Sequence, residues 1–455
     1  MKSVSEAVTN PLALGYRRAR HRIPELPGEA LVVIDDIHSP RGAPLKRVVV
    51  TGYGVISPFG VGWETAWSNL IQGASGIREL SGIDTSGLPV NIGGQVAGFD
   101  PGAWLPASLV RRTTRPAHLA LVAATLALRD AKLDVDAELA PRLGVTVGTA
   151  CGASSALVDA GTAFAERGFM ALSPYTFTST GVVTVASEVA LHVGAQGPAA
   201  CTATACATGA TCVGEAMRLI QLGKADVVLA GGADDTITPF DIAAAARARA
   251  LSRRQGDPSA ASRPFDTGRD GFVMSAGAGI LVLESEEHAL ARQAHVYGEV
   301  AGYAATTDAH NLTSPHPEGT AVERAVRLAL EDAGVTPDEV GYVNAHGTGT
   351  RMNDTAELKV IRRVFGERAT SVPVSSTKSM TGHMLGAAGA VEAMIAMEAL
   401  RTGIVPPTVN CDDPEDPEMN FVAHRAQEHA ADVAVSNSFG FGGHNAVLVL
   451  RRRRD

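Results

Sequence analysis

The sequence predicts an α/β protein in which helices cover both faces of a parallel β-sheet. Short segments of β-branched residues alternate with longer segments of helical periodicity, as expected for parallel strands joined by crossover helices. At 455 residues the chain exceeds the usual size of one hydrophobic core, so we expect two compact parts. Its 48 glycines, 45% hydrophobic residues and 5% aromatic residues indicate an interior of alanine and valine, with helices lying close to each other and to the sheet.

The expected elements form two rounds of similar order. Strands are placed where β-branched residues cluster, and helices where apolar residues recur three and four positions apart. The first round is strand 48–50, helices 63–72 and 118–132, strand 143–148, helices 182–193 and 207–222, and strand 225–231. The second begins near residue 298 and has helix 321–333, strand 341–344, helix 355–365, strand 371–374, helix 386–400, and strands 420–423 and 446–450. Sequence repetition between the rounds is too faint to detect by eye.

Residues 1–46 differ from the rest of the chain. They contain an arginine cluster at 17–22, several prolines and one short apolar run at 30–34 that could form a strand. No uninterrupted apolar segment follows a basic start, so a signal peptide is not expected. The segment is interpreted as either a disordered tail or an arm that contacts a second subunit.

Charge and cysteine content exclude several classes of function. A net charge of −9 argues against a nucleic-acid partner, which needs a basic face. The five cysteines form no CxxC pair, so neither a zinc site nor a disulfide framework is expected. No apolar run reaches the roughly 18 residues of a membrane span, and we expect a soluble protein. A reactive thiol is easier to maintain in a reducing compartment, which favours a cytoplasmic location.

Cys206 lies where a segment of small residues changes into a helical pattern. After it, Ala210, Val213, Met217 and Ile220 predict a helix with one buried face. A thiol at the N-terminal end of that helix would meet unpaired N–H groups and the positive end of the helix dipole, so we expect a lowered thiol pKa and a nucleophile. The alternative is a small buried hydrophobic residue, as most free cysteines are.

Two glycines in this helix predict a close neighbour. A glycine costs a surface helix about 1 kcal/mol relative to alanine. Gly209 and Gly214 therefore indicate that another element approaches the helix backbone. We expect the helix to be buried and to cross the core of its domain.

Two histidines lie in similar settings downstream. His346, in Asn-Ala-His-Gly-Thr-Gly-Thr, follows an expected strand, and His383, in Lys-Ser-Met-Thr-Gly-His, lies between a strand end and a helix. A single histidine of this kind is more often structural, but two of them with a cysteine at a helix start favour a catalytic site. Near the end of the chain, a glycine-rich turn around Phe441 can direct N–H groups at a developing oxyanion.

These four motifs together resemble the signatures of the elongating β-ketoacyl-acyl-carrier-protein synthases of the thiolase superfamily. They are Thr-Ala-Cys-Ala-Thr-Gly at Cys206, Asn-Ala-His-Gly-Thr at His346, Lys-Ser-Met-Thr-Gly-His at His383, and Asn-Ser-Phe-Gly-Phe-Gly-Gly at Phe441. Their order and spacing are similar too, and the likeness extends over about residues 46–451. Four motifs in register are far more specific than any one of them.

The resemblance implies a fold and a domain organisation. The fold would be the duplicated thiolase-like fold, a five-layered α-β-α-β-α sandwich. An N-terminal extension at 1–46 would precede a first half at 47–297 with Cys206 and a second half at 298–455 with both histidines. The site would lie between the halves.

The resemblance also implies a decarboxylating acyltransferase that extends an acyl or polyketide chain by two carbons. Cys206 would take the acyl chain from a carrier-protein thioester. His346 and His383, as neutral imidazoles, would bind the malonyl carbonyl and assist loss of carbon dioxide. N–H groups of Cys206 and Phe441 would form the oxyanion hole, and Phe441 would gate the acyl pocket. No metal or organic cofactor is implied, because the phosphopantetheine arm arrives on the acyl carrier protein.

Five charged residues match supporting positions of this family. Lys378 and Glu357 match an ion pair, which we expect to be buried and to orient the histidines; otherwise they are surface charges. Arg111, Arg112 and Arg249 match positions where related synthases receive the acidic carrier protein, and the alternative is that they are ordinary solvated arginines.

Three positions depart from the family pattern. Ala276 stands where an acidic residue is usual, His444 stands where threonine is common, and Asp235 follows Asp234 in place of a single acid. These differences are compatible with a specialised pathway rather than bulk fatty-acid synthesis.

Several alternatives stay open at the level of sequence. A thiolase would need a second cysteine near the C-terminus, but none follows Cys411. A chain-length-factor-like or scaffold subunit would normally have lost the cysteine, although such a protein could be the partner in a heterodimer. The sequence leaves open a homodimer or a heterodimer with a related ketosynthase-like subunit. It also leaves open an interaction module that retains the residues without catalysing.

Overall fold

The computed structural model describes residues 45–453. The expected strand at 30–34, and nearly all of the expected N-terminal arm at 1–46, lie outside the described residues. No helix in the described part of the chain is long and apolar enough to cross a membrane.

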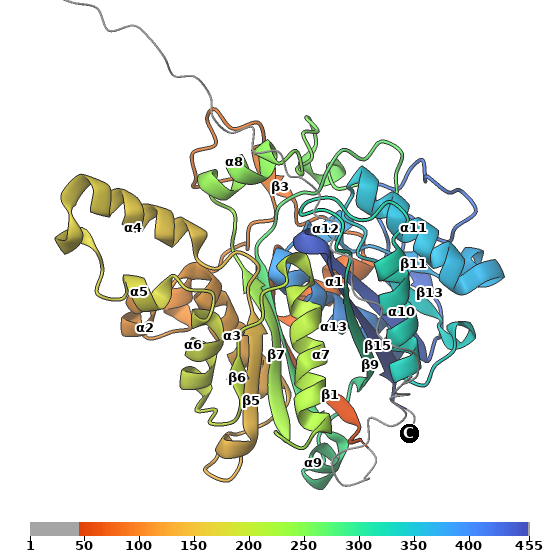
Figure 1. Ribbon diagram of the computed structural model, residues 1–455, viewed down its shortest axis with the longest axis horizontal. Helices are drawn as coiled ribbons and strands as arrows, with labels where there is room; N and C mark the ends of the chain where they lie inside the picture. Colours follow the sequence, from red (N-terminus) through yellow and green to blue (C-terminus); the bar gives the residue numbers. More distant parts are fainter. Residues whose placement is uncertain (1–44, 454–455) are drawn as a thin grey trace, which may run out of the picture. The chain divides into compact units, whose positions relative to one another are not determined.

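The centre of the described chain is one mixed sheet of eleven strands (Figure 1). Ten of the strands lie side by side, and β2 (Gly60–Val61) pairs with β1 alone. In spatial order they are β11 (Val374–Ser375), β10 (Tyr342–Asn344), β14 (Val433–Gly440), β15 (His444–Arg452), β9 (Gly298–Thr307), β1 (Val48–Ser57), β8 (Gly277–Ser285), β7 (Val227–Asp234), β5 (Leu143–Gly148) and β6 (Ala199–Ala200). Two short ladders, β3 (Arg78–Glu79) with β4 (Ile92–Gly93) and β12 (Ile404–Val405) with β13 (Gln427–Glu428), complete the strands.

The sheet consists of two halves with the same topology. In the first half the order is β6-β5-β7-β8-β1, and in the second it is β11-β10-β14-β15-β9. When the strands of each half are numbered along the chain, both orders read 3-2-4-5-1. The parallel and antiparallel pairs also correspond one to one. The halves meet where β1 pairs with β9. The duplication is therefore plain in the topology, although the sequence hides it.

The expectation of a purely parallel sheet is wrong. In each half, the fourth strand pairs antiparallel with the fifth, and the fifth pairs antiparallel with the first. In the second half, only the three residues Phe441–Gly443 connect the fourth strand to the fifth, and a connection this short permits only an antiparallel pair. The expected strand at 420–423 is also absent, since Ala423 forms only an isolated bridge with Thr408.

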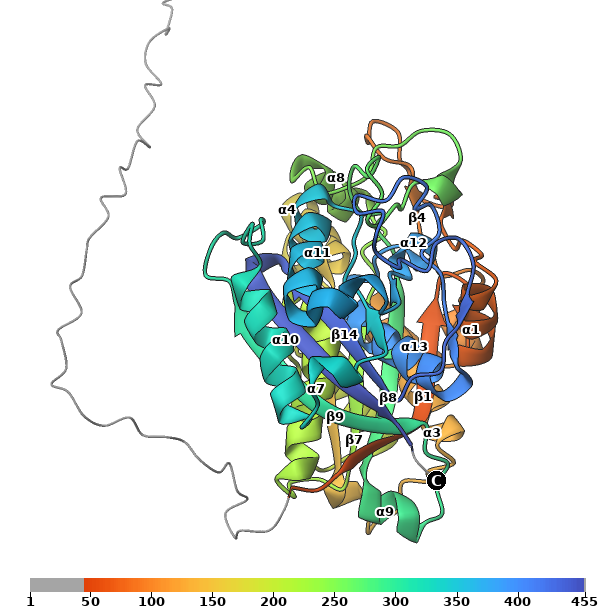
Figure 2. The ribbon, with the colours of Figure 1, turned by 90° about the vertical axis from the view of Figure 1, so that its right-hand side faces the viewer.

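Helices divide the described chain into five layers, which lie side by side in Figure 1, and Figure 2 views them from the side of the second outer layer. The first outer layer has α3 (Arg115–Asp130) and α6 (Thr184–Val193), which pack on the first half of the sheet. Helices α7 (Thr208–Gln221) and α13 (Ala388–Thr402) lie between the two halves of the sheet. The second outer layer has α10 (Thr320–Asp332) and α11 (Arg351–Phe365). This arrangement confirms the five-layered thiolase-like fold.

The two central helices approach each other closely. A Cβ on Gly209 of α7 would lie 2.6 Å from the backbone nitrogen of Ala390, and a Cβ on Gly214 would overlap the ring of Tyr303. From Ala388 to Leu400, every residue of α13 is buried. Ten of the fourteen residues of α7 are buried as well, so the buried helix expected from the two glycines is confirmed. Because Cys206 precedes α7 and His383 precedes α13, this packing brings two distant parts of the sequence together.

The remaining helices lie around this core. They are α1 (Trp63–Ile71), α2 (Ala107–Arg112), α4 (Ser154–Arg167), α5 (Thr176–Ser179), α8 (Pro239–Arg247), α9 (Glu286–Ala291) and α12 (Lys378–Thr381). Among them, α4 and α5 extend from one side of the sandwich, next to α6 (Figure 1). Large apolar side chains are exposed along this region, including Phe169, Met170 and Phe177, and the exposed fraction of Phe177 is 95%.

Candidate active site

Cys206 lies in a single helical turn, Ala205–Ala207, that leads directly into α7. Ala205 has a φ of +49°, a left-handed conformation that is unusual for a residue with a side chain. Thr208 supports the turn, because its hydroxyl donates to the carbonyl oxygen of Ala205 and accepts from the N–H of Thr204. A Cβ on Gly440 would lie 3.0 Å from the backbone nitrogen of Cys206, so the backbone before Phe441 lies against the cysteine.

The expectation of a lowered thiol pKa is wrong. Burial raises the pKa of Cys206 to about 11. The charge of Lys378 and hydrogen bonds from the backbone N–H groups of Phe441 and Cys206 act in the opposite direction but do not overcome burial. The resting residue is therefore a neutral thiol. The same two N–H groups lie where an oxyanion formed next to the sulfur could accept hydrogen bonds.

His346 and His383 lie together at the ends of β10 and α12. Their ring centroids are 5.6 Å apart, with an angle of 81° between the ring planes. Phe439 packs against the first ring and Phe272 against the second. Burial and the charge of Lys378 hold the pKa of both histidines well below the usual value, so both rings are neutral. Nδ1 of His346 and both ring nitrogens of His383 are buried and have no hydrogen-bond partner among the described residues.

Lys378 is buried beside these histidines, but its partner differs from the expected one. Its Nζ donates to the carbonyl oxygen of His346 over 2.7 Å and forms an ion pair with Glu392. Glu357 accepts hydrogen bonds from Asn437 and from the backbone N–H groups of His346 and Gly347 instead. The expected pair of Lys378 with Glu357 is therefore wrong, because backbone amides and an asparagine already occupy the Glu357 carboxylate.

Glu392 is the residue that sequence reasoning missed. It lies on α13, nine residues after His383, and it is 2% exposed. It is the only charged residue between 384 and 397, a run of small and apolar residues. An isolated carboxylate inside an apolar helix needs a buried partner, and this signal could have identified it.

Two carboxylates on successive turns of α11 hold the loop of His346. Glu357 accepts from the N–H groups of His346 and Gly347, both over 2.8 Å. Asp354 accepts from the next two N–H groups, those of Thr348 and Gly349, both over 3.1 Å. Burial raises the pKa of Glu357 to about 7 and also raises that of Asp354. Four consecutive amides are thus fixed by one face of one helix.

A cavity of about 180 Å³ joins the three chemical groups. Cys206, His346 and His383 all line it. Its remaining walls come from residues in the segments 248–250, 308–315, 348–353 and 439–443, together with Phe272 and Asn445. The cavity is therefore small and mostly apolar, with one thiol and two neutral imidazoles facing it.

The three departures from the family pattern lie at defined places. Ala276 is buried, and the adjoining segment holds the backbone of His383, whose N–H donates to the carbonyl of Val273 and whose carbonyl accepts from Ser275. Asp234 is buried and accepts hydrogen bonds from the 149–151 loop and from the N–H of Gly386, and burial raises its pKa to about 6. Asp235, which follows it, forms an ion pair with Arg115 over 2.8 Å. His444 lies outside the cavity lining, at the start of β15.

The three expected docking arginines do not form one cluster with the cavity. Arg249 lines the cavity together with Ala248 and Ala250. Arg111 and Arg112 lie at the end of α2, where Arg112 forms an ion pair with Glu188 of α6 over 2.8 Å. In the described part of the chain, no group of three or more His, Cys, Asp or Glu side chains is arranged to hold a metal ion.

Comparisons with known proteins give consistent matches. Residues 45–289 match the family described as "Beta-ketoacyl synthase, N-terminal domain", and residues 297–412 match "Beta-ketoacyl synthase, C-terminal domain". The chain is 44% identical over 409 residues to the 3-oxoacyl-[acyl-carrier-protein] synthase 2 of Synechocystis sp., with 90% of this chain and 98% of that protein covered. The protein of the same name from Vibrio cholerae is 43% identical over 410 residues, covering 90% and 99%.

Solved structures are similar over the same part of the chain. The ishigamide ketosynthase/chain length factor has a TM-score of 0.83 and 35% identity. A type II polyketide acyl-carrier protein in complex with its ketosynthase bound to the hexaketide gives 0.83 and 34%, and so does a β-ketoacyl synthase from Burkholderia phymatum. Each comparison covers 90% of this chain and 100% of the other chain.

Proposed function

The chain belongs to the β-ketoacyl synthase family, and from this premise we propose a mechanism in which Cys206, His346 and His383 carry out a decarboxylative condensation. The enzyme is a β-ketoacyl-acyl-carrier-protein synthase, an acyltransferase that elongates a fatty-acid or polyketide chain by condensing an enzyme-bound acyl group with a malonyl group on acyl carrier protein. The observation that carries the mechanism is that one thiol and two neutral imidazoles line a single cavity.

The first step transfers the acyl group to Cys206. Its sulfur attacks the carbonyl carbon of the carrier thioester, and the resulting oxyanion accepts hydrogen bonds from the N–H groups of Cys206 and Phe441. The carbon–sulfur bond to phosphopantetheine then breaks, and the carrier sulfur leaves as a thiol with the proton that Cys206 gives up. The resting thiol is neutral, so its proton leaves during the attack. One oxyanion-hole donor contributes about 3 kcal/mol in acyl-transfer enzymes.

The second step uses the two histidines. Their ring N–H groups donate to the carbonyl oxygen of the malonyl thioester. The bond to the malonyl carboxylate breaks, carbon dioxide leaves, and the electron pair forms an enolate. The enolate carbon attacks the acyl carbonyl on Cys206, and the cysteine leaves as a thiolate that regains a proton from solvent. Burial keeps His346 and His383 neutral and leaves ring nitrogens without protein partners, which supports this role.

Lys378 and Glu357 act on His346 from its backbone side. Lys378 donates to its carbonyl oxygen, and Glu357 accepts from its N–H. The positive charge of Lys378 also favours neutral rings in His346 and His383. We assign both residues to orienting the histidines, with Glu392 as the counter-ion of Lys378.

The enzyme works with two kinds of protein partner. The first is the acyl carrier protein, and we place its docking at Arg249, beside the cavity, and at Arg111 and Arg112 on α2. The second is a subunit of the same family, in a homodimer or a ketosynthase and chain-length-factor heterodimer, as in the ishigamide ketosynthase/chain length factor and the ketosynthase from Xenorhabdus doucetiae in complex with its chain length factor. The exposed apolar side chains between α4 and α6 support such a contact.

Two further assignments complete the proposal. Phe441 gates the acyl pocket, because it lines the cavity and follows the backbone that touches Cys206. A cytoplasmic location suits a free catalytic thiol. The chain-length-factor-like alternative finds no support in the site, because the nucleophile and both histidines are in place.

The test is to follow the mass of the purified protein after incubation with acyl carrier proteins of increasing chain length, with Cys206→Ala in parallel. We expect acyl mass on the wild-type protein only, at the peptide that contains Cys206. If no carrier loads the wild-type protein, alone or with a candidate partner subunit, the chain is a scaffold subunit rather than the condensing enzyme.

A further inference from the structure

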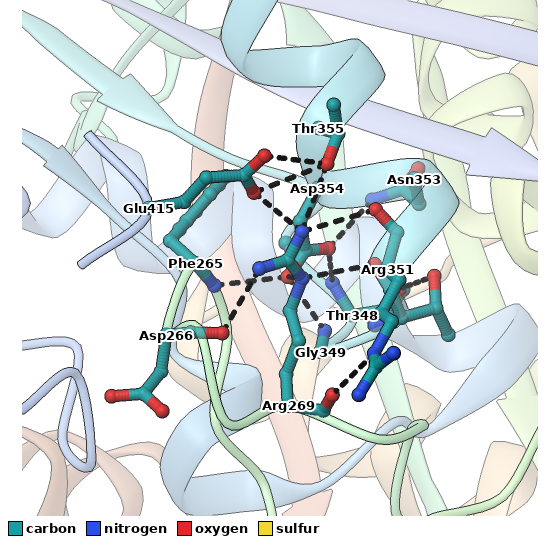
Figure 3. Close-up of polar contacts among 12 residues, drawn as sticks. Phe265, Asp266, Arg269, Thr348, Gly349, Arg351, Asn353, Asp354, Thr355 and Glu415 are labelled. Carbon is teal, nitrogen blue, oxygen red and sulfur yellow. Dashed lines mark hydrogen bonds and ion pairs between the residues drawn. The ribbon is translucent and has the colours of Figure 1, made fainter. Parts of the chain in front are cut away.

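Arg269 is the centre of a buried network that the mechanism above does not use (Figure 3). The residue is 4% exposed and lies in the first half of the chain, in the segment before β8. Its guanidinium forms ion pairs with Asp354 and Glu415, which are both in the second half of the chain. Few arginines are buried to this extent unless the charge is paired on several sides.

Every nitrogen of this guanidinium has a partner. Nε lies 3.6 Å from the Asp354 carboxylate, and Nη1 donates to the carbonyl oxygen of Asp266 over 2.9 Å. Nη2 donates to the Thr355 hydroxyl over 2.9 Å and to the carbonyl oxygen of Arg351 over 3.1 Å. The planar guanidinium group of Arg269 thus links the first half of the chain to the beginning of α11.

Asp354 transmits this contact to the loop of His346. Its carboxylate is fully buried and accepts the N–H groups of Thr348 and Gly349. A second contact runs in parallel, because the N–H of Gly271 donates to the carbonyl oxygen of Gly349 over 3.1 Å. Thr348 lies two residues from His346 and lines the same cavity.

Arg269 is the counter-ion of Asp354, whose carboxylate also accepts hydrogen bonds from the N–H of Phe265 and from the side-chain amide of Asn353. Among the described residues, Arg269 alone forms an ion pair with this carboxylate. A buried carboxylate without a counter-ion tends to take up a proton, and a protonated carboxyl group accepts hydrogen bonds from backbone amides less strongly. Loss of the guanidinium would therefore weaken the hydrogen bonds from the amides of Thr348 and Gly349 that fix the loop.

We propose that Arg269 is a positioning residue that sets the location of His346 across the boundary between the two halves, acting through Asp354 and the amides of Thr348 and Gly349. This inference rests on the proposed role of His346. It predicts that loss of Arg269 slows the malonyl step, which needs His346, and leaves acylation of Cys206 nearly intact. Displacement of a reacting group by about 1 Å costs about 100-fold in rate.

The test compares four purified full-length variants with the wild type: Arg269→Gln, Arg269→Lys, His346→Ala and Arg263→Gln. Arg263 is the matched control, because it lies in the same segment and is nearly buried, but its ion pairs are with Asp266 and Asp412. The two measurements are acyl mass on Cys206 and release of carbon dioxide from malonyl carrier protein. For Arg269→Gln we expect about a 100-fold slower release of carbon dioxide. Its acylation rate should stay within about threefold, since the turn of Cys206 is held by Thr208 and lies against Gly440 rather than depending on this loop.

The controls separate positioning from general stability. Arg269→Lys keeps the positive charge but lacks the planar guanidinium group, so its rate of carbon dioxide release should lie between those of the wild type and Arg269→Gln. Arg263→Gln should leave the ratio of the two rates unchanged. If Arg269→Gln lowers both rates in equal proportion, or neither rate, the positioning role is wrong. If the wild type itself neither loads nor decarboxylates, the proposed function is what fails.

Hydrogen exchange supplies a measurement that does not depend on activity. The peptide that contains residues 346–350 should exchange faster in Arg269→Gln than in wild type and should be unchanged in Arg263→Gln. Equal protection of this peptide in Arg269→Gln and wild type would overturn the inference even if the enzyme were inactive for another reason.

Discussion

Lys378 donates a hydrogen bond to the carbonyl oxygen of His346 over 2.7 Å, and its charge lowers the pKa of the same residue's ring. One buried ammonium group therefore fixes the backbone of a histidine and keeps its imidazole neutral. The same charge acts on His383.

Replacing Lys378 should change the pH profile of decarboxylation. In Lys378→Met the lowering effect of the charge is lost, so the pKa of His346 and His383 rises toward its usual value. In the proposed mechanism the neutral rings are the active form, so the acidic limb of the rate profile should move to higher pH. The measurement is carbon dioxide release between about pH 5 and pH 8, the range around an ordinary histidine pKa. Lys359→Met, which removes an exposed lysine paired with Glu318, is the control. An unmoved acidic limb would contradict the electrostatic role.

A double-mutant cycle should separate the two candidate partners of Lys378. Breaking a buried ion pair by removing one partner costs about 3–5 kcal/mol, because the other charge is left uncompensated. Lys378→Met and Glu392→Gln should therefore show strong coupling in the free energy of unfolding, measured with urea. Lys378→Met and Glu357→Gln should show much weaker coupling. Equal coupling for both pairs would mean that Lys378 interacts with both carboxylates, Glu392 and Glu357, to the same extent.

Gly440 should be required for acylation of Cys206. A Cβ at this position would lie 2.6 Å from the carbonyl oxygen of Thr204 and 3.0 Å from the nitrogen of Cys206, so Gly440→Ala must displace the backbone that carries the Phe441 N–H. Loss of one oxyanion-hole donor slows acyl transfer by about 100-fold or more. The measurement is the rate of acyl loading by mass. Gly161→Ala, where nothing lies within 4 Å, is the control and should load at the wild-type rate.

Cys206 should react slowly with alkylating agents near neutral pH. Burial raises the pKa of its thiol to about 11, so the thiolate fraction keeps increasing as the pH rises. The rate of iodoacetamide labelling, read as mass on the Cys206 peptide, should increase steadily between about pH 7 and pH 9, the region around an ordinary thiol pKa of about 8.5. A plateau below pH 8 would show that the N-terminal end of α7 lowers the thiol pKa more than burial raises it.

Local sequence patterns predicted much of the secondary structure. The strand at 143–148 is reproduced to the residue, and the expected helix at 207–222 is observed at Thr208–Gln221. The strands β8 and β14 were not anticipated, and their antiparallel pairing is a tertiary property that alternation of elements does not encode. The same limit explains why the sheet was expected to be parallel.

In the candidate site, too, local motifs predict some features, whereas others depend on the whole fold. Motifs identified Cys206, His346 and His383, and the structure places all three around one cavity. The thiol pKa was misjudged because burial depends on the whole fold, whereas the helix end is visible in the sequence. Glu392 was missed because its contact with Lys378 joins α13 to α12 and follows from packing between the layers.

A single-turnover experiment tests the central claim most directly. Protein loaded with an acyl group on Cys206 is isolated and mixed with malonyl carrier protein labelled in its free carboxyl group. We predict that each acyl group lost from the protein is matched by one labelled carbon dioxide and one β-ketoacyl carrier product, and that His346→Ala and His383→Ala stop this step without preventing loading. If the acyl group stays on Cys206 while malonyl carrier protein remains unchanged, the chain is not a condensing enzyme by this mechanism.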